Sequence, residues 1–254
     1  MSNPIVSVRP HQVVFGALGL GRNMEAVQAD RLLDRAYERG MRAIDLAEGY
    51  GQGLARHLVA DHIRRRPNTE WRVWDKIGIL AKDFASRGSP VGSYWDKGEI
   101  LDKELLRLSE FSRQVVLERV QLHVPVPVFT RALEHKLQKF NSSMEVSWGL
   151  SNHSPKQLKV STEVLRSLGF RTDLAQVQLS VLEQKALSEL LPAAEALSLM
   201  TAANRIFGRG LLSRDTNQLS NRLLSSPKVR AKALLWEREL DQLRALSLQS
   251  SCSL

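Results

Sequence analysis

The chain has 254 residues, of which 43% are hydrophobic and 25% charged, as is typical of a soluble globular protein. Its single cysteine, Cys252, excludes an intrachain disulfide framework and a cysteine-based metal cluster. No apolar run approaches the roughly 18 residues that a membrane helix needs, and the first ten residues lack the apolar core of a signal peptide, so we expect a cytoplasmic protein without a membrane partner.

The net charge of +9 raises the question of a phosphate-bearing partner. The basic residues are scattered, however, and residues 64–66 form the only tight arginine run. No nucleic-acid-binding motif accompanies this run. We therefore read the charge as a solvated surface and do not expect a nucleic-acid partner.

Short β-rich segments alternate with longer amphipathic segments, which is typical of βαβ units and a parallel sheet. No linker rich in Pro, Gly or Ser divides the chain, so we expect one domain over residues 1–254. Together with the chain length, this predicts an α/β fold of the TIM-type (β/α)8 barrel class. The predicted strands are 13–19, 42–47, 71–78, 117–124, 145–151, 174–180 and 197–203, and the predicted helices are 25–39, 54–66, 99–114, 128–140, 155–168, 186–196 and 227–247.

Residues suited to acid–base chemistry fall at matching ends of three successive strands. In a parallel barrel, functional residues gather at the carboxyl ends of the strands. Each of these residues alone has an ordinary explanation, such as a turn aspartate, a packed tyrosine, a solvated lysine or a structural histidine. Their shared position favours one site. The four are Asp45, Tyr50, Lys76 and His123, and the next strands contribute Ser151, Asn152 and Gln176.

The segment GMRAIDLAEGYGQGL (40–54) resembles the aldo-keto reductase signature, in which Gly-x-Arg-x-x-Asp-x-Ala precedes Tyr-Gly. Further segments are similar to that family in the same order, and the resemblance spans residues 13–215. Within that family, the motif sequences most resemble those of the aldose (galactose or fucose type) dehydrogenase branch. The other segments are WDKIG (74–78), LERVQLHVPVP (117–127), SWGLSNHSPKQL (147–158), DLAQVQLS (173–180) and GRGLLSRD (208–215).

The resemblance implies an oxidoreductase that interconverts a carbonyl and an alcohol, using NADP or NAD. Tyr50 would be the general acid in reduction and the base in oxidation. Lys76, held by Asp45, would lower the phenol pKa because a nearby cation favours the phenolate. His123 would orient the substrate oxygen. The implied cofactor-binding residues are Ser151, Asn152, Gln176, Asn204 and Arg209, and no metal site is expected.

Several positions depart from the family pattern. Ala55 and Arg56 stand where the family usually carries Ser-Glu, and Asn204 stands near the place of an aromatic residue. Residues 216–254 contain one long predicted helix, 227–247, and neither a β-rich segment nor a Pro-Gly loop. We therefore expect the eighth strand to be missing. Either the predicted helix 227–247 or a second subunit in a homodimer would cover the resulting open edge.

Two other functions stay open. An enzyme that kept the acid–base residues without the redox cofactor could catalyse a dehydration, elimination or isomerisation, because these reactions need proton transfer but no hydride. The chain could also be a non-catalytic binding subunit. The substrate is expected to be a small carbonyl or sugar-like molecule, and loop 81–98 is a candidate for covering it.

Overall fold

The computed structural model describes residues 9–22, 24–79, 94–208 and 212. The chain divides into two compact units, Met1–Leu174 and Ala175–Leu254. Seven strands join in one sheet in the order of the sequence. Single-domain organisation over residues 1–254 stays a prediction. The strands are β1 (Val14–Gly16), β2 (Ala43–Asp45), β3 (Arg72–Ile77), β4 (Val116–Leu122), β5 (Ser147–Ser151), β6 (Thr172–Gln178) and β7 (Met200–Asn204).

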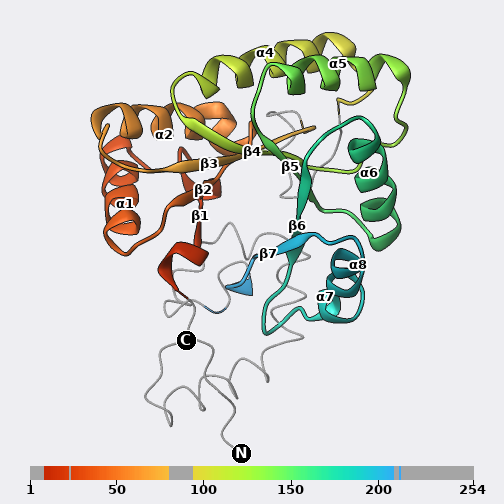
Figure 1. The fold of residues 1–254 in the computed structure, drawn as a ribbon. Coiled ribbons are helices and arrows are strands. Elements are labelled where there is room, and N and C mark those ends of the chain that lie inside the picture. The colour runs from red at the N-terminus through yellow and green to blue at the C-terminus, as the bar shows by residue number, and fades with distance from the viewer. Residues whose placement is uncertain (1–8, 23, 80–93, 209–211, 213–254) are drawn as a thin grey trace, which may run out of the picture. The chain divides into compact units, whose positions relative to one another are not determined.

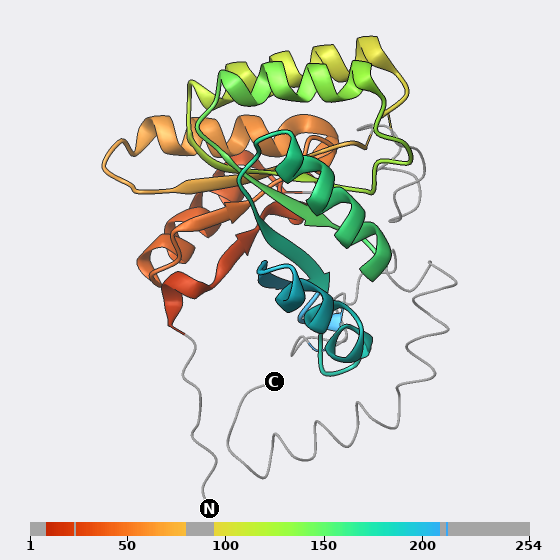
Figure 2. The same ribbon diagram turned by 45° about the vertical axis from the view of Figure 1, so that its right-hand side comes forward.

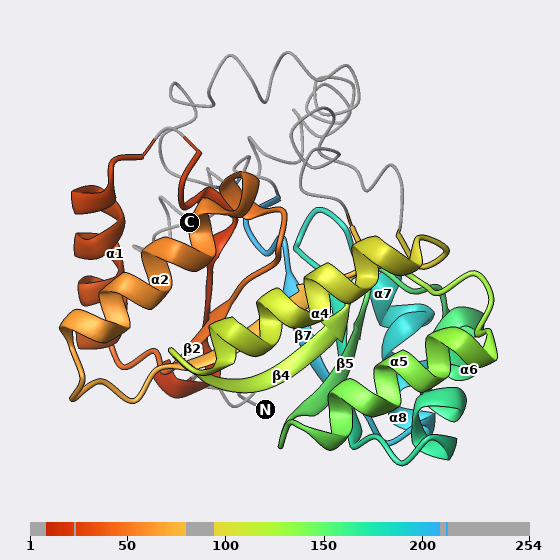
Figure 3. The ribbon, with the colours of Figure 1, turned by 90° about the horizontal axis from the view of Figure 1, so that it is seen from above.

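In the first unit, strands β1 to β5 pair in parallel, each with the next along the chain. Five helices lie along one face of these strands, and α4 and α5 run side by side (Figures 1 and 3). This is the arrangement that successive βαβ units produce, since each crossover returns a helix to the same face. The helices are α1 (Ala26–Glu38), α2 (Leu54–Arg65), α4 (Gly98–Ser112), α5 (Arg131–Ser142) and α6 (Pro155–Ser167).

Local sequence explains where these helices begin and which face they bury. Helix α6 starts with Pro155 after Ser154, whose hydroxyl accepts a hydrogen bond from the Gln157 backbone N–H, as is usual for an N-cap serine. Helix α1 buries Ala29, Leu33 and Ala36, which the 3.6-residue period places on one face. The core between sheet and helices therefore forms from the apolar stripes visible in the sequence.

The second unit contains two short helices and β7 (Figure 2). The predicted helix 186–196 is divided at Glu189 into α7 (Lys185–Ser188) and α8 (Leu190–Ala196). Within this unit the Leu179 N–H donates to the Asn204 carbonyl at 3.2 Å. The predicted helix 227–247 and the missing eighth strand concern residues that lie outside the described part of the chain.

The α/β fold and the seven predicted strands are confirmed. Most strands are shorter than expected, whereas β6 has the predicted length but begins two residues earlier. The first strand ends at Gly16 because Ala17–Gly19 form a 3₁₀ turn, so the predicted strand 13–19 was too long. Within the described ranges, no helix combines the length and apolar character needed to cross a bilayer.

Candidate active site

The carboxyl ends of three neighbouring strands bring the predicted acid–base residues together. Asp45 ends β2, Lys76 lies next to last in β3, and His123 follows the last residue of β4. The register places Asp45 beside Trp74 and Lys76 beside Gln121. Because the strands are parallel and in sequence order, these ends share one edge of the sheet.

Lys76 is the centre of this group. Its side chain is 1% exposed, and Nζ lies 2.6 Å from each carboxylate oxygen of Asp45. Nζ also donates to the Leu46 carbonyl at 3.0 Å and lies 3.3 Å from the Tyr50 hydroxyl oxygen. A buried ammonium needs this degree of pairing, because desolvation would otherwise favour the neutral amine.

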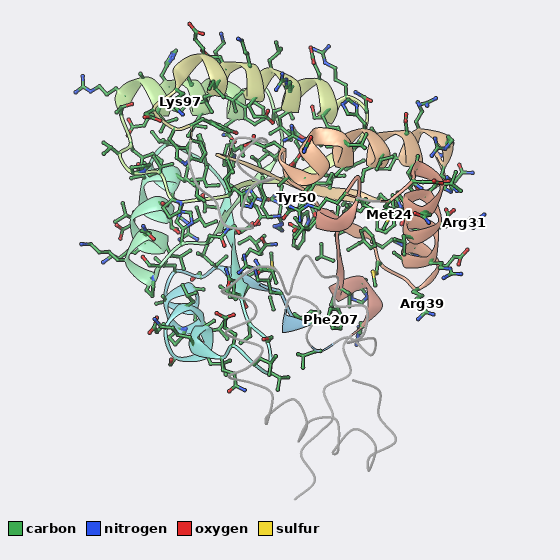
Figure 4. All side chains as sticks on the ribbon, turned by 180° about the vertical axis from the view of Figure 1, so that it is seen from behind. Met24, Arg31, Arg39, Tyr50, Lys97 and Phe207 are labelled. Atoms are coloured by element: carbon green, nitrogen blue, oxygen red, sulfur yellow. The ribbon has the colours of Figure 1, made fainter. Side chains whose placement is uncertain are left out.

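Tyr50, which is labelled in Figure 4, begins a short helical turn, η3 (Tyr50–Gly53), between β2 and α2 in the chain. Its ring is buried and lies edge-on to the His123 ring, with centroids 6.2 Å apart. The next residue, Gly51, has φ +58°, and a Cβ there would lie 2.5 Å from the Leu20 carbonyl oxygen. The turn that presents Tyr50 therefore requires glycine.

Charge and burial act in opposite directions on the two central groups. Burial lowers the pKa of Lys76, but the charges of Asp45 and Tyr50, together with the hydrogen bonds to both, outweigh burial and raise the pKa of Lys76. For Tyr50, burial raises the pKa and the Lys76 cation lowers it, while Asp45 raises it again, and the net pKa stays above the ordinary value of 10.0. Lys76 thus acts on the phenol pKa in the expected direction, but burial and Asp45 outweigh it and keep the net pKa above the ordinary value. At neutral pH, Tyr50 carries its proton.

Gln121 belongs to this site although the sequence did not single it out. It is fully buried, and its Nε2 donates to Asp45 Oδ1 at 3.3 Å. It lies two residues before His123, and alternation along a strand places both on one face. That spacing was the signal that could have identified it. Its amide fixes the orientation of the carboxylate that holds Lys76.

Ser151 and Asn152 follow at the end of β5. Asn152 adopts φ +58°, a conformation that asparagine tolerates better than most residues. Its Nδ2 donates to the His123 carbonyl at 2.9 Å and lies 3.2 Å from the Ser151 hydroxyl. Behind them, His153 Nδ1 contacts the Ser151 carbonyl at 2.8 Å. The amide of Asn152 is thus held beside His123.

The remaining predicted cofactor contacts are not part of the first unit. Gln176 and Asn204 lie in the unit Ala175–Leu254, and Arg209 lies outside the described residues. Within the second unit, the buried Oδ1 of Asn204 has no hydrogen-bond partner among the described atoms. Its neighbour Arg205 donates to Gln178 Oε1 at 2.7 Å.

The arginine run at residues 64–66 is paired with carboxylates. Arg65 and Arg66 each lie 2.9 Å from an Asp30 oxygen, and Arg64 lies 3.0 Å from Asp61. The pKa of Asp30 is lowered, because hydrogen bonds from these arginines and from His62 outweigh its partial burial. Other cations, such as Arg31 and Arg39, extend singly from the outside of α1 (Figure 4). This pattern supports the interpretation of the basic charge as a solvated surface.

Comparison with known proteins identifies relatives of the chain. The chain is 24% identical to a D-threo-aldose 1-dehydrogenase from Pseudomonas sp over 223 residues, which cover 78% of this chain and 66% of that protein. The holo form of an aldo-keto reductase from Bacillus halodurans superposes with a TM-score of 0.61 at 19% identity, over 80% of this chain and 64% of that structure. The chain thus spans slightly less than two thirds of the length of these relatives.

The structural likeness shows the fold, which is that of an aldo-keto reductase (β/α)8 barrel with seven strands in the described residues. The family model named aldo/keto reductase family matches residues 12–248, nearly the whole sequence. On the match over residues 12–248, the chain belongs to the aldo/keto reductase family.

Proposed function

We propose that the chain interconverts a carbonyl and an alcohol with NADP or NAD, and that Tyr50 transfers the proton. The observation that carries the proposal is the Lys76 ammonium, which is bonded to both oxygens of Asp45 and lies 3.3 Å from the Tyr50 hydroxyl oxygen. The arrangement supplies a buried phenol with a cation beside it, as proton transfer to a carbonyl oxygen requires.

In the direction of reduction, the Tyr50 hydroxyl donates its proton to the carbonyl oxygen. Lys76 stabilises the phenolate that remains, and Asp45 keeps Lys76 charged. His123, whose ring lies beside Tyr50, hydrogen-bonds the same substrate oxygen and orients it. In oxidation the phenolate accepts the proton of the alcohol. When bound, the nicotinamide supplies or accepts the hydride.

The residues at the end of β5 fit a nicotinamide carboxamide. That group has one acceptor and one NH₂ donor, and it suits neighbours that can both donate and accept. Ser151 and Asn152 carry such groups, and the bond from Asn152 to the His123 carbonyl fixes the amide in place before a ligand arrives. The orphaned acceptor of Asn204 suits a hydrogen-bond donor. Gln176 and Arg209 stay proposed cofactor contacts on the family resemblance alone.

We further propose a sugar-like substrate, on the similarity to the D-threo-aldose 1-dehydrogenase. An aldose carries an oxidisable hydroxyl at its anomeric carbon, which matches the proton acceptor described above. Aldoses are therefore the first substrates to test, followed by small aldehydes in the reverse direction.

The first experiment titrates the purified protein with NADPH and NADH and follows nicotinamide fluorescence. Saturable binding and aldose-dependent cofactor reduction are expected, and Tyr50→Phe should keep binding while losing turnover. Absence of saturable binding up to about millimolar cofactor, the upper end of usual affinities, would overturn the redox proposal. In that case, Tyr50→Phe separates a cofactor-independent acid–base enzyme, whose biological activity it abolishes, from a binding subunit, whose activity it spares.

A further inference from the structure

A second group of charged side chains is buried on the other face of β3 from Lys76. Successive residues of a strand point to opposite faces, so Asp75 faces the helices while Lys76 faces away from them. Asp75 Oδ2 accepts a hydrogen bond from Arg56 Nε of α2 at 2.6 Å. Arg56 Nη1 pairs in turn with Glu104 of α4. One guanidinium therefore joins β3 to two helices.

These groups are removed from solvent. Asp75 is fully buried, Glu104 is 6% exposed and Arg56 is 9% exposed. Burial lowers the pKa of Arg56, but the charges of Asp75 and Glu104 offset this and raise it, so Arg56 is a cation. Buried ion pairs of this kind seldom add stability over apolar packing, because desolvation is costly. Their presence directly behind the Lys76 strand calls for another role.

Asp75 connects this ion pair to the candidate active site. Its other oxygen, Oδ1, accepts the backbone N–H of Lys76 at 2.7 Å. Asp75 thus connects Arg56 to the next residue of β3, Lys76, whose ammonium contacts Tyr50. Among the described residues, Lys76 of β3, Asp45 of β2 and His123 after β4 face Tyr50, and Asp75 acts from behind Lys76.

We propose that Arg56 is a positioning residue, which holds Asp75 against the Lys76 backbone and offsets the Asp75 charge behind the Tyr50–Lys76 pair. The role rests on the proposed function of Tyr50 in proton transfer. Without a cation at position 56, two buried carboxylates would oppose formation of the phenolate. With the Arg56 cation present, the Asp75 carboxylate can hold the end of β3 in place while opposing the Tyr50 phenolate less strongly.

The chain offers a direct measurement of this coupling, because it contains three tyrosines, Tyr37, Tyr50 and Tyr94. Tyrosine labelled with ¹³C at Cζ reports ionisation by NMR, and Tyr→Phe variants assign the three signals. The measurement is made on the full chain and needs neither cofactor nor substrate. It compares wild type with Asp75→Asn, Arg56→Gln and the double variant.

Asp75→Asn should move the onset of the Tyr50 titration to lower pH by roughly 0.5 to 1 unit, since it removes a buried negative charge. Arg56→Gln should move the onset to higher pH, and the double variant should return toward wild type. Asp61→Asn is the matched control: Asp61 lies on the same helix as Arg56, in an exposed pair with Arg64. It should leave the titration in place.

The proposal would be overturned if the Tyr50 titration of Asp75→Asn began at a pH no lower than that of wild type. It would also be overturned if Asp61→Asn shifted the Tyr50 titration as much as Asp75→Asn does. A purely structural pair would lower the melting temperature of Arg56→Gln without shifting Tyr50. If Arg56→Gln fails to fold, Glu104→Gln replaces it and should shift Tyr50 in the direction of Asp75→Asn, but less. A shifted titration in a protein that binds no nicotinamide would refute the proposed function while leaving the Arg56–Asp75 coupling intact.

Discussion

Both carboxylate oxygens of Asp45 lie 2.6 Å from Nζ of Lys76, so this buried ion pair holds the ammonium in place within the candidate active site. The pair determines where a cation can act on Tyr50. It also makes Lys76 hard to replace, because the carboxylate would remain buried without a partner.

Lys76→Met should lower kcat/KM for carbonyl reduction by about 10²- to 10⁴-fold, the usual contribution of general acid catalysis, because it removes the cation that supports proton transfer by Tyr50. The methionine keeps much of the volume of the side chain but leaves the Tyr50 phenolate without a cation. Steady-state kinetics on the folded variant measures the loss. Lys159→Met, on the exposed face of α6, is the control and should keep wild-type rates. A Lys76→Met enzyme with unchanged kcat/KM would contradict the role of Lys76.

The raised pKa of Tyr50 predicts opposite pH dependences for the two directions of the reaction. Burial raises this pKa above 10.0 against the opposing effect of Lys76, so the phenol is protonated throughout the neutral range. Reduction needs the protonated form and should be flat from about pH 6 to 9. Oxidation needs the phenolate, and its kcat/KM should rise about tenfold per pH unit over the same range. Because reduction consumes a proton, the ratio of the two rates depends on pH whichever group transfers it. A kcat/KM for reduction that falls between about pH 6 and 9 would therefore refute the assignment of Tyr50.

Gly51→Ala should both destabilise the protein and reduce turnover. The positive φ alone costs an alanine about 1–2 kcal/mol. The new Cβ would also lie 2.5 Å from the Leu20 carbonyl oxygen, a backbone atom that cannot rotate away. Relief of this contact must move the turn that starts at Tyr50. Urea unfolding measures the first effect and kcat the second. Gly169→Ala also has a positive φ but meets no atom within 4 Å, so it should show the conformational cost without the loss of turnover.

The meeting of Asp45, Lys76 and His123 could be predicted because each ends one parallel strand, and parallel strands end at one edge. Gln121 was missed because a buried glutamine inside a strand carries no motif. The Arg56–Asp75 pair could not be read from spacing, since its members are 19 residues apart on a helix and a strand. Arg56 was visible only as a departure from the family pattern. Which carboxylate it meets depends on how α2 packs against β3, which local sequence does not encode.

The raised pKa of Glu48 predicts that the ionised Glu48 side chain destabilises the folded protein as pH increases. Burial, with help from the negative charge of Glu104, raises this pKa well above 4.5, while hydrogen bonds from Tyr94 and Ile79 oppose the shift. A group with a raised folded-state pKa stabilises fully below its unfolded pKa and loses this contribution as pH rises through the folded value. Glu48→Gln should therefore gain stability over wild type above about pH 5. Urea unfolding across this range tests it, and a pH-independent difference between the two proteins would contradict it.

His153 should impose the opposite pH dependence. Burial lowers its pKa from 6.5 to about 4, although its hydrogen bond to the Ser151 carbonyl opposes the shift. A depressed folded-state pKa gives stability that is present above the unfolded value and lost as pH falls through the folded one. At roughly 1.4 kcal/mol per pKa unit, wild type should lose about 3 kcal/mol between pH 6.5 and 4 relative to His153→Gln. The exposed His57→Gln is the matched control and should follow wild type. Parallel unfolding curves for wild type and His153→Gln over that interval would show that His153 is not held neutral by the fold.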